Sequence, residues 1–287
     1  MIVPCFNQGL FLNECLHSIS MQSYTNWECI VVNDGSSDET EEVAKKWLER
    51  DKRFKYVYQE NKGLPSARNT GLAHSNGEYI QFLDSDDFLD QEKFKKSIEK
   101  FSNPSIDIVI SNFFIFNEET KSLENPYCAL GEHLFNLDSI LFEWGKKFSI
   151  PIHCALIKSH TLIGYSFPTE LKAREDWPLW VFLYKSSLRT FFINEPLAFY
   201  RQHNKSLTKN SRLMDLEKLK AIGIIEQLIS KEKSLKLYKN HIQEISKEYT
   251  ALQNLYLGVL NSRTFKLACF FKNNLIFVKN KLNRYSK

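Results

Sequence analysis

The sequence predicts an α/β fold, in which an open sheet is flanked by helices and followed by a helical C-terminal extension. Over residues 1–90, short apolar runs rich in β-branched and aromatic residues alternate with segments whose apolar residues recur at helical spacing. Beyond residue 213 the chain changes to two long stretches of helical spacing. Strands that alternate with helices pair in parallel through right-handed crossovers, so we expect a parallel arrangement in the N-terminal part.

The predicted elements begin in the order β-α-β-α-β-α-β. Strands are predicted at residues 2–6, 27–32, 54–59 and 79–83. The intervening helices are predicted at residues 10–21, 39–50 and 66–72. At the start of the second helix, Asp38 and Glu41 have the spacing of a capping box. Farther along we expect helices at residues 91–101, 137–144 and 175–185, strands at residues 106–116 and 152–157, and loops at residues 117–131 and 159–169.

Composition narrows the class of protein. With 287 residues the chain can bury a substantial core. Its six cysteines lack the spacing of a metal site, and we interpret them as reduced, mostly buried thiols. No run approaches the roughly 18 apolar residues that span a bilayer, and the start lacks a basic signal segment, so we expect a cytoplasmic protein. The net charge of +4 alone argues neither for nor against nucleic acid, and we predict no nucleic-acid partner.

Three carboxylates, Asp84, Asp86 and Asp87, follow the fourth predicted strand. Residues at i and i+2 of an extended chain point the same way, so Asp84 and Asp86 can share one target. Mg²⁺ or Mn²⁺ fits between them, because such an ion is held by one or two carboxylates and takes its other ligands from phosphates and water. Two other interpretations stay open here. The acids can form a solvated loop that caps the next helix, or belong to a dehalogenase-type phosphatase, although Phe88 stands where that class has Thr or Val.

The polar loops of the predicted sheet meet at one edge. In open sheets of this kind, ligands bind outside the carboxyl ends of the strands. Polar loops follow three of the strands, at residues 4–7, 34–38 and 84–87, and Arg68 lies on a helix that leads into the same sheet. Acids, an aromatic side chain and an arginine at one edge are more than a solvated loop requires, so we expect a binding site there.

Several blocks of the sequence resemble one family. They are VPCFN at residues 3–7, VVNDGSSDET at 31–40, GLPSARNTGL at 63–72, GEYIQFLDSDD at 77–87, EDW at 175–177 and EPLAFYRQHNKSLT at 195–208. In this order they resemble the inverting glycosyltransferases of family 2, of the bacterial surface-polysaccharide type, over roughly residues 1–210. The resemblance implies the GT-A fold, a Rossmann-like mixed sheet flanked by helices.

The resemblance also implies a division of the chain and a set of contacts. A nucleotide-binding half is expected over residues 1–116, an acceptor and catalytic half over residues 117–210, and a helical extension over residues 211–287. The metal is implied to be Mn²⁺ or Mg²⁺, bound by Asp86 with Asp84 and His203. The residues implied to contact the nucleotide are Pro4, Phe6, Asn7, Asp34, Arg68, Asp84 and Ser85.

Asp176 is the general base that the resemblance implies, and Glu175 is its nearest competitor. Inverting transfer needs a base that removes the proton of the acceptor hydroxyl while the anomeric carbon is attacked, and a positioned base contributes about 10²–10⁴-fold. A plainer interpretation stays open, because carboxylates in the first turn of a helix also complement the helix dipole.

The predicted reaction transfers one sugar from a nucleotide-diphosphate sugar, with UDP-sugar as the family's usual donor, to a glycan or lipid-linked acceptor. A sugar nucleotidyltransferase is one alternative, although the loop at residues 4–10 lacks the Gly-rich, basic character of its phosphate loop. A catalytically silent nucleotide- or glycan-binding module is the other, and it would keep Phe6 and Asp34 without needing the base.

The pattern of the C-terminal part indicates helices and a candidate membrane-contacting segment, and it contains no candidate catalytic residue. Helices at residues 213–229 and 235–260 are expected to pack or to form a homo-oligomer. Residues 264–287 mix large apolar side chains with Lys and Arg and contain no acid. A basic amphipathic helix of this kind suits the anionic inner face of a membrane, so we expect peripheral membrane contact. A buried closing helix is the alternative.

Overall fold

The computed structural model describes residues 1–204 and 206–262. The chain divides into two compact units, Met1–Ser234 and a second that begins at Leu235. Helix α7 (Ser211–Glu226) belongs to the first unit, because the backbone N–H of Lys172 donates to Glu217 at 2.7 Å and Arg174 donates to the carbonyl of Met214. The predicted division between residues 210 and 211 therefore falls inside the first unit. Helix α8 (Lys231–Asn261) begins at the end of the first unit and continues into the second.

The N-terminal sheet is fully parallel. Its strands are β1 (Ile2–Cys5), β2 (Cys29–Asp34) and β3 (Phe54–Gln59), in that order across the sheet. Every residue of β1 and β2 is buried, as expected for parallel strands that are covered on both faces. The covering helices are α1 (Gly9–Ser20), α2 (Thr40–Arg50) and α3 (Leu64–His74).

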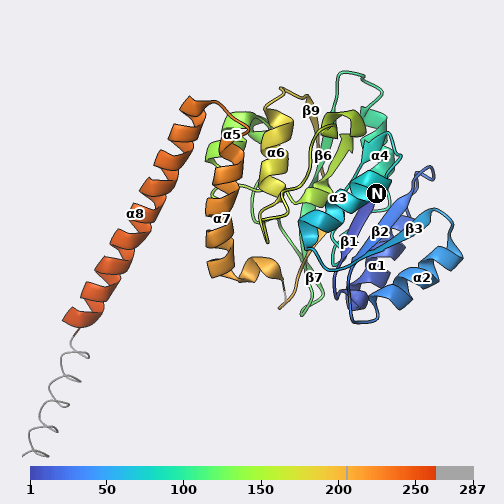
Figure 1. Cartoon of the computed structure of the whole chain (residues 1–287), viewed down its shortest axis with the longest axis horizontal. Helices are drawn as coiled ribbons and strands as arrows, with labels where there is room; N and C mark the ends of the chain where they lie inside the picture. The colour runs from blue at the N-terminus through green and yellow to red at the C-terminus, as the bar shows by residue number, and fades with distance from the viewer. Residues whose placement is uncertain (205, 263–287) are drawn as a thin grey trace, which may run out of the picture. The chain divides into compact units, whose positions relative to one another are not determined.

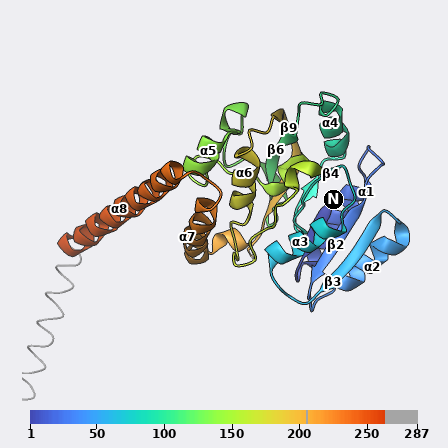
Figure 2. The same ribbon diagram turned by 45° about the horizontal axis from the view of Figure 1, so that its top comes forward.

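These helices lie on both sides of the parallel sheet. Helices α1 and α2 pack against each other, whereas α3 contacts β1 and β2 from the other side (Figures 1 and 2). Right-handed crossovers produce this arrangement when the chain moves outward from β1 to β3 and then returns past β1. The sequence prediction of a parallel β-α-β-α-β-α arrangement is confirmed.

The second sheet is mixed. Its order is β4 (Tyr79–Ile80), β8 (Ala155–Lys158), β6 (Ile108–Asn117), β9 (Thr190–Gln202) and β5 (Phe88–Leu89), with β7 (Ser122–Glu124) paired to β6. Strands β6 and β9 run parallel, and the other pairs are antiparallel. The helices of this part are α4 (Lys93–Lys100), α5 (Leu137–Phe142) and α6 (Asp176–Tyr184).

The predicted strand at residues 79–83 is shared between the two sheets. Its first two residues form β4 and pair with β8. The backbone of Ile2 then donates to Gln81 at 2.8 Å and accepts from Leu83 at 3.0 Å, so the end of the strand runs beside β1. The acidic residues that follow Leu83 therefore lie where the parallel sheet and the mixed sheet meet.

Two predicted loops contain more structure than the sequence indicated. Residues 117–131 include β7, which pairs antiparallel with the end of β6. Residues 159–169 begin with a 3₁₀ turn, Ser159–Leu162, and are then fastened to α3, because Asn69 donates to the carbonyl of Phe167 at 2.8 Å and accepts from its N–H at 2.7 Å. Phe167 is 1% exposed, so this segment is packed core rather than a free surface loop.

The helices and the cysteines of the described residues bear on two further predictions. None of its helices combines the length and the apolar character that crossing a bilayer needs. Five of the six cysteines lie in this part, and all five are free and buried. The segment at residues 264–287 lies outside the described residues.

Candidate active site

A cavity of about 460 Å³ lies where the loops after β1 and the shared strand meet the start of α6. The described residues that line it all belong to the first unit. Residues 159–169 do not contribute to its lining. The cavity brings together these predicted site residues: Pro4, Phe6, Arg68, Asp84, Asp86, Glu175 and Asp176.

Arg68, on α3, joins the acidic turn to the start of α6. Its side chain is buried, its Nη2 donates to Asp84 at 2.7 Å, and its Nη1 pairs with Glu175. Burial opposes the charge of the guanidinium, but the two carboxylates more than offset this effect and raise its pKa. Arg68 therefore stays charged and fixes one predicted nucleotide-binding acid and one predicted catalytic acid.

Asp176, the first residue of α6, lies in a different environment from its neighbour Glu175. Glu175 is buried and paired with Arg68, whereas no ion pair of the described residues engages Asp176. Burial, and secondarily the charge of Glu175, raise the pKa of Asp176 to about 7 against the opposing effect of Arg68 and Arg174. A carboxylate with this pKa can take up a proton near neutral pH, as a general base must.

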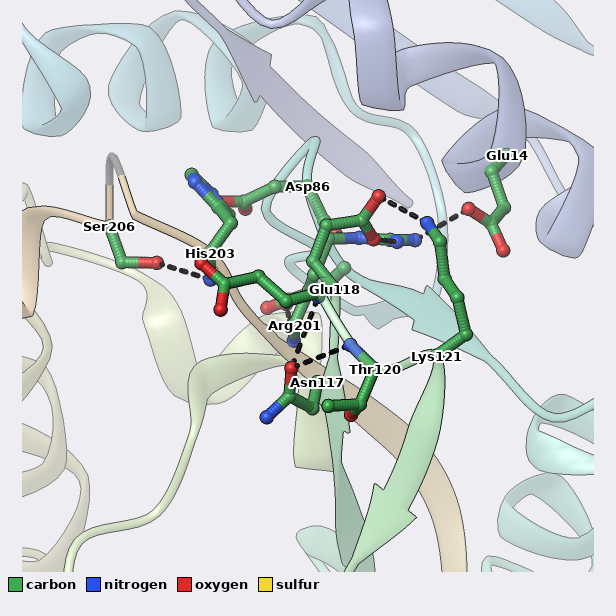
Figure 3. A network of polar contacts seen from close by, with 11 residues as sticks. Glu14, Asp86, Asn117, Glu118, Thr120, Lys121, Arg201, His203 and Ser206 are labelled. Atoms are coloured by element: carbon green, nitrogen blue, oxygen red, sulfur yellow. Dashed lines mark hydrogen bonds and ion pairs between the residues drawn. The ribbon is translucent and has the colours of Figure 1, made fainter.

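Asp86 and His203 approach each other across the acidic turn. Asp86 Oδ2 lies 2.9 Å from Nε2 of His203, which stands just after β9 (Figure 3). The ring of Phe11 packs on this imidazole with centroids 4.8 Å apart. Within the described residues no group of three or more His, Cys, Asp or Glu side chains could hold a metal ion. One carboxylate and one imidazole suit an ion that takes its remaining ligands from phosphates and water.

Arg201, on β9, fixes the acidic turn and was not predicted from the sequence. Its Nε donates to the carbonyl of Asp86 at 2.6 Å, and its backbone N–H donates to Asp87 Oδ1 at 2.7 Å (Figure 3). The guanidinium also pairs with Glu14, at 2.6 Å, and with Glu118. Its position two residues before His203 was the available signal, but a single arginine on a strand has no chemical signature of its own.

Asp87 also lines the cavity, but it is buried and pairs with His153, whereas Asp86 pairs with His203. Its Oδ2 lies 2.9 Å from Nδ1 of His153, whose backbone carbonyl accepts from Gln81 at 2.6 Å. Burial raises the pKa of Asp87 to about 6, although His153 opposes this shift. The third acid of the turn is therefore an anchor for the wall of the cavity. The sequence grouped it with two acids that point elsewhere.

Asp34 is held by the backbone of the loop that follows β3. Its carboxylate accepts from Gln59 at 2.6 Å, from the N–H of Lys62 at 2.9 Å and from the N–H of Gly63 at 2.8 Å. It does not line the cavity, and neither does Ser85, which is 4% exposed. Their predicted contacts with a nucleotide stay predictions.

Asn7 and Asp38 connect the loops after β1 and β2. Asn7, at a left-handed φ of 51°, accepts from the N–H of Ser37 at 2.8 Å. Asp38 accepts from the N–H of Gly9 at 2.9 Å and from the N–H of Thr40 at 3.1 Å. The predicted capping box is wrong, because Glu39 precedes the helix and makes no side-chain cap, while Asp38 joins the starts of α1 and α2.

Comparisons with known proteins agree with this architecture. The family model described as "Glycosyl transferase family 2" matches residues 1–166. A putative teichuronic acid biosynthesis glycosyltransferase of Bacillus subtilis, TuaG, is 27% identical over 211 residues, which cover 73% of this chain and 81% of TuaG. The chain spans only 31% to 62% of the length of three other curated bacterial relatives.

Solved structures share the fold. The Staphylococcus aureus protein TarS in complex with UDP-GlcNAc has a TM-score of 0.61 at 19% identity, covering 84% of this chain and 72% of that one. The mannosyltransferase PcManGT of Pyrobaculum calidifontis, in complex with GDP-Man and Mn²⁺, has a TM-score of 0.56 at 18% identity, covering 98% of this chain and 86% of that one.

The expected GT-A fold is confirmed by these structures together with the family match. Because the family model covers more than half of the 287 residues, the match does not rest on a single motif. The chain belongs to glycosyl transferase family 2.

Proposed function

We propose that this glycosyltransferase moves one sugar from a nucleotide-diphosphate sugar to a hydroxyl of a glycan or lipid-linked acceptor, with inversion. The observation that carries the proposal is the contrast between two adjacent acids. Glu175 is neutralised by Arg68, whereas Asp176 enters the cavity without an ion pair and with a pKa of about 7. A single available carboxylate favours a direct displacement, because a double displacement would need a second one as nucleophile.

In this reaction Asp176 accepts the proton of the acceptor hydroxyl as its oxygen attacks the anomeric carbon. The bond between that carbon and the diphosphate breaks, and the nucleoside diphosphate leaves. Arg68 keeps Glu175 and Asp84 in place, and Arg201 holds the backbone of Asp86, so the acids keep their relative positions during the reaction.

A divalent metal fits beside the acidic turn. Asp86 and His203 would hold it, with the carboxylate of Asp84 nearby but engaged by Arg68. When bound, the ion supplies positive charge that stabilises the departing diphosphate. An imidazole in the ligand set favours Mn²⁺ over Mg²⁺, which prefers oxygen ligands. The Mn²⁺ complex of PcManGT supports a metal of this kind.

UDP-sugar is the proposed donor, and the UDP-GlcNAc complex of TarS supports it. The proposed acceptor class is a surface polysaccharide or its lipid-linked precursor. The similarity to TuaG, a putative teichuronic acid biosynthesis glycosyltransferase, supports this proposal. We place the enzyme in the cytoplasm, since five buried free thiols suit a reducing compartment. Homo-oligomer formation, and contact of residues 264–287 with the inner membrane face, are proposed from the sequence alone.

Calorimetric titration with a panel of nucleoside diphosphates, with and without Mn²⁺, tests the proposal. We expect UDP to bind more tightly when Mn²⁺ is present, and the Asp86→Ala variant to lose this strengthening. Asp215→Ala, which removes an exposed carboxylate on α7, serves as the matched control and should bind like the wild type. If no nucleotide binds in a metal-dependent way, the proposed function is wrong and the silent binding module is favoured.

A further inference from the structure

Arg174 lines the cavity immediately before the two acids at the start of α6. Its backbone φ of 63° lies in the left-handed region, which is unfavourable for a residue with a Cβ and marks a position held by its surroundings. Its Nε donates to the carbonyl of Met214 on α7 at 2.7 Å. The guanidinium is therefore fixed in direction at one nitrogen, while Nη1 and Nη2 form the outer fork.

The other arginines of the cavity differ from Arg174 in their partners. Arg68 is neutralised by Asp84 and Glu175, and Arg201 by Glu14 and Glu118. Among residues 1–204 and 206–262, by contrast, no carboxylate forms an ion pair with Arg174. The charge of Arg174 acts on Asp176 without a direct ion pair, so this half-buried cation would also stabilise a negatively charged ligand in the cavity.

A glycine lies beside the fork. Gly145, at a φ of 71°, faces the guanidinium, and a Cβ at this position would lie 3.4 Å from Nη1 of Arg174. The neighbouring wall is aromatic, with Tyr127, Trp144 and Tyr200 lining the same cavity. A fixed guanidinium fork beside apolar rings is the arrangement that binds an oxyanion attached to a larger, partly apolar molecule.

We propose that Arg174 binds an oxyanion carried by the acceptor, a phosphate or a carboxylate, and so places the acceptor hydroxyl at Asp176. This inference rests on the proposed function and extends it by naming the chemical class of the acceptor. Arg174 and Asp176 line the same cavity, so a ligand held by the fork lies in the cavity that contains the proposed base. Neutral acceptors would lack this contact and would bind more weakly.

The test compares the wild type with Arg174→Gln, Arg174→Lys and the control Arg212→Gln, which removes an exposed arginine of α7. Each protein is saturated with UDP and Mn²⁺ and titrated calorimetrically with inorganic phosphate and, separately, with acetate. We expect Arg174→Gln to weaken oxyanion binding about 10- to 100-fold, because a charge-assisted contact is lost. The tighter of the two probes identifies phosphate or carboxylate as the preferred group.

The lysine variant separates binding from a structural role. Both substitutions remove the bond to Met214, so a purely structural arginine would make Arg174→Lys and Arg174→Gln equally defective. We expect Arg174→Lys to retain part of the oxyanion affinity and Arg212→Gln to retain all of it. Equal probe binding by wild type and Arg174→Gln would overturn the inference.

UDP binding is measured in the same proteins and separates the two proposals. We expect Arg174→Gln to bind UDP and Mn²⁺ like the wild type. Loss of UDP affinity in that variant would assign Arg174 to the donor's diphosphate and would overturn the inference. Failure of the wild type itself to bind UDP would instead contradict the proposed donor, whatever the probes show.

Discussion

At the scale of single residues, the roles of two neighbouring acids are separated by one arginine. Arg68 compensates the charge of Glu175, and Asp176 keeps its oxygens for a ligand. Environments that differ in this way push the pKa values of adjacent carboxyl groups apart and assign them different roles. The helix-dipole interpretation explains why acids stand at the start of α6, but not why only one of them is paired.

Replacing Asp176 by Asn should reduce turnover about 10²–10⁴-fold, because the amide cannot accept the proton of the acceptor hydroxyl. Nucleotide binding should be unchanged, since the acidic turn is held by Arg68 and Arg201 and not by Asp176. Steady-state kinetics together with calorimetry provides the measurement. Unchanged turnover would exclude Asp176 as the base, and loss of nucleotide binding would show that the variant disturbs the donor site.

The same assignment fixes the sign of the pH dependence. Because the pKa of Asp176 is raised to about 7, the wild-type base is protonated in acid, and turnover should fall as the pH decreases through this value.

The raised pKa of Asp176 also means that the folded state holds this proton more tightly than the unfolded state does. Stability is therefore lost as the pH rises towards 7, and Asp176→Asn should be more thermostable than the wild type at pH 8 but not at pH 4.

At the scale of elements, the site depends on how closely α3 approaches β1. Gly71 on α3 allows this approach, because a Cβ there would lie only 2.3 Å from Cγ2 of Ile2. The approach places Arg68, one turn earlier on the same helix, against Asp84. Arg201 on β9 holds the other side of the acidic turn. The positions of the proposed metal ligands and of the proposed base are thus set by packing between elements, not by the motif alone.

Gly71→Ala should therefore lower the free energy of unfolding by about 1–3 kcal/mol, the usual range for overpacking a tight contact. Gly223→Ala on α7 is the matched control, because nothing lies within 4 Å of a Cβ at that position. Alanine's better helix propensity should leave that variant as stable as the wild type or more so, by up to about 1 kcal/mol. Chemical denaturation of both variants gives the comparison, and equal stability would contradict the close approach of α3 to β1.

At the scale of the whole molecule, the lining residues of the cavity and the segment proposed to contact a membrane lie in different parts of the sequence. All lining residues of the cavity belong to Met1–Ser234, whereas the segment proposed to touch a membrane begins at residue 264. Binding of a nucleotide and binding of a lipid surface should consequently respond to different changes in the chain.

Deleting residues 264–287 should abolish sedimentation with vesicles that contain anionic lipid, because each Lys or Arg near such a surface contributes about 1 kcal/mol. UDP and Mn²⁺ should bind the shortened chain as they bind the full one. Vesicles of neutral lipid provide the control for non-specific adsorption. Unchanged sedimentation with anionic vesicles would reject the membrane contact and favour a closing helix.

The fold class and the family can be predicted from the amino-acid sequence, because both are encoded in local patterns. Strand and helix periodicity depend on neighbouring residues, and the motif blocks place Asp86, Asp176 and His203 at fixed points along them. Predicted strand bounds differ from the structure where tertiary pairing divides a strand. Residues 79–83 are an example, because two sheets share them.

The contacts between these side chains depend on packing between distant parts of the chain. Arg68 and Glu175 are 107 positions apart in the sequence, and Arg201 and Glu14 are 187 positions apart. No local pattern specifies such a pair, because its formation depends on how buried helices and strands pack and on which charges burial leaves without water. For the same reason, only the packed structure distinguishes Arg174, which forms no ion pair with a described carboxylate, from Arg68 and Arg201, which do.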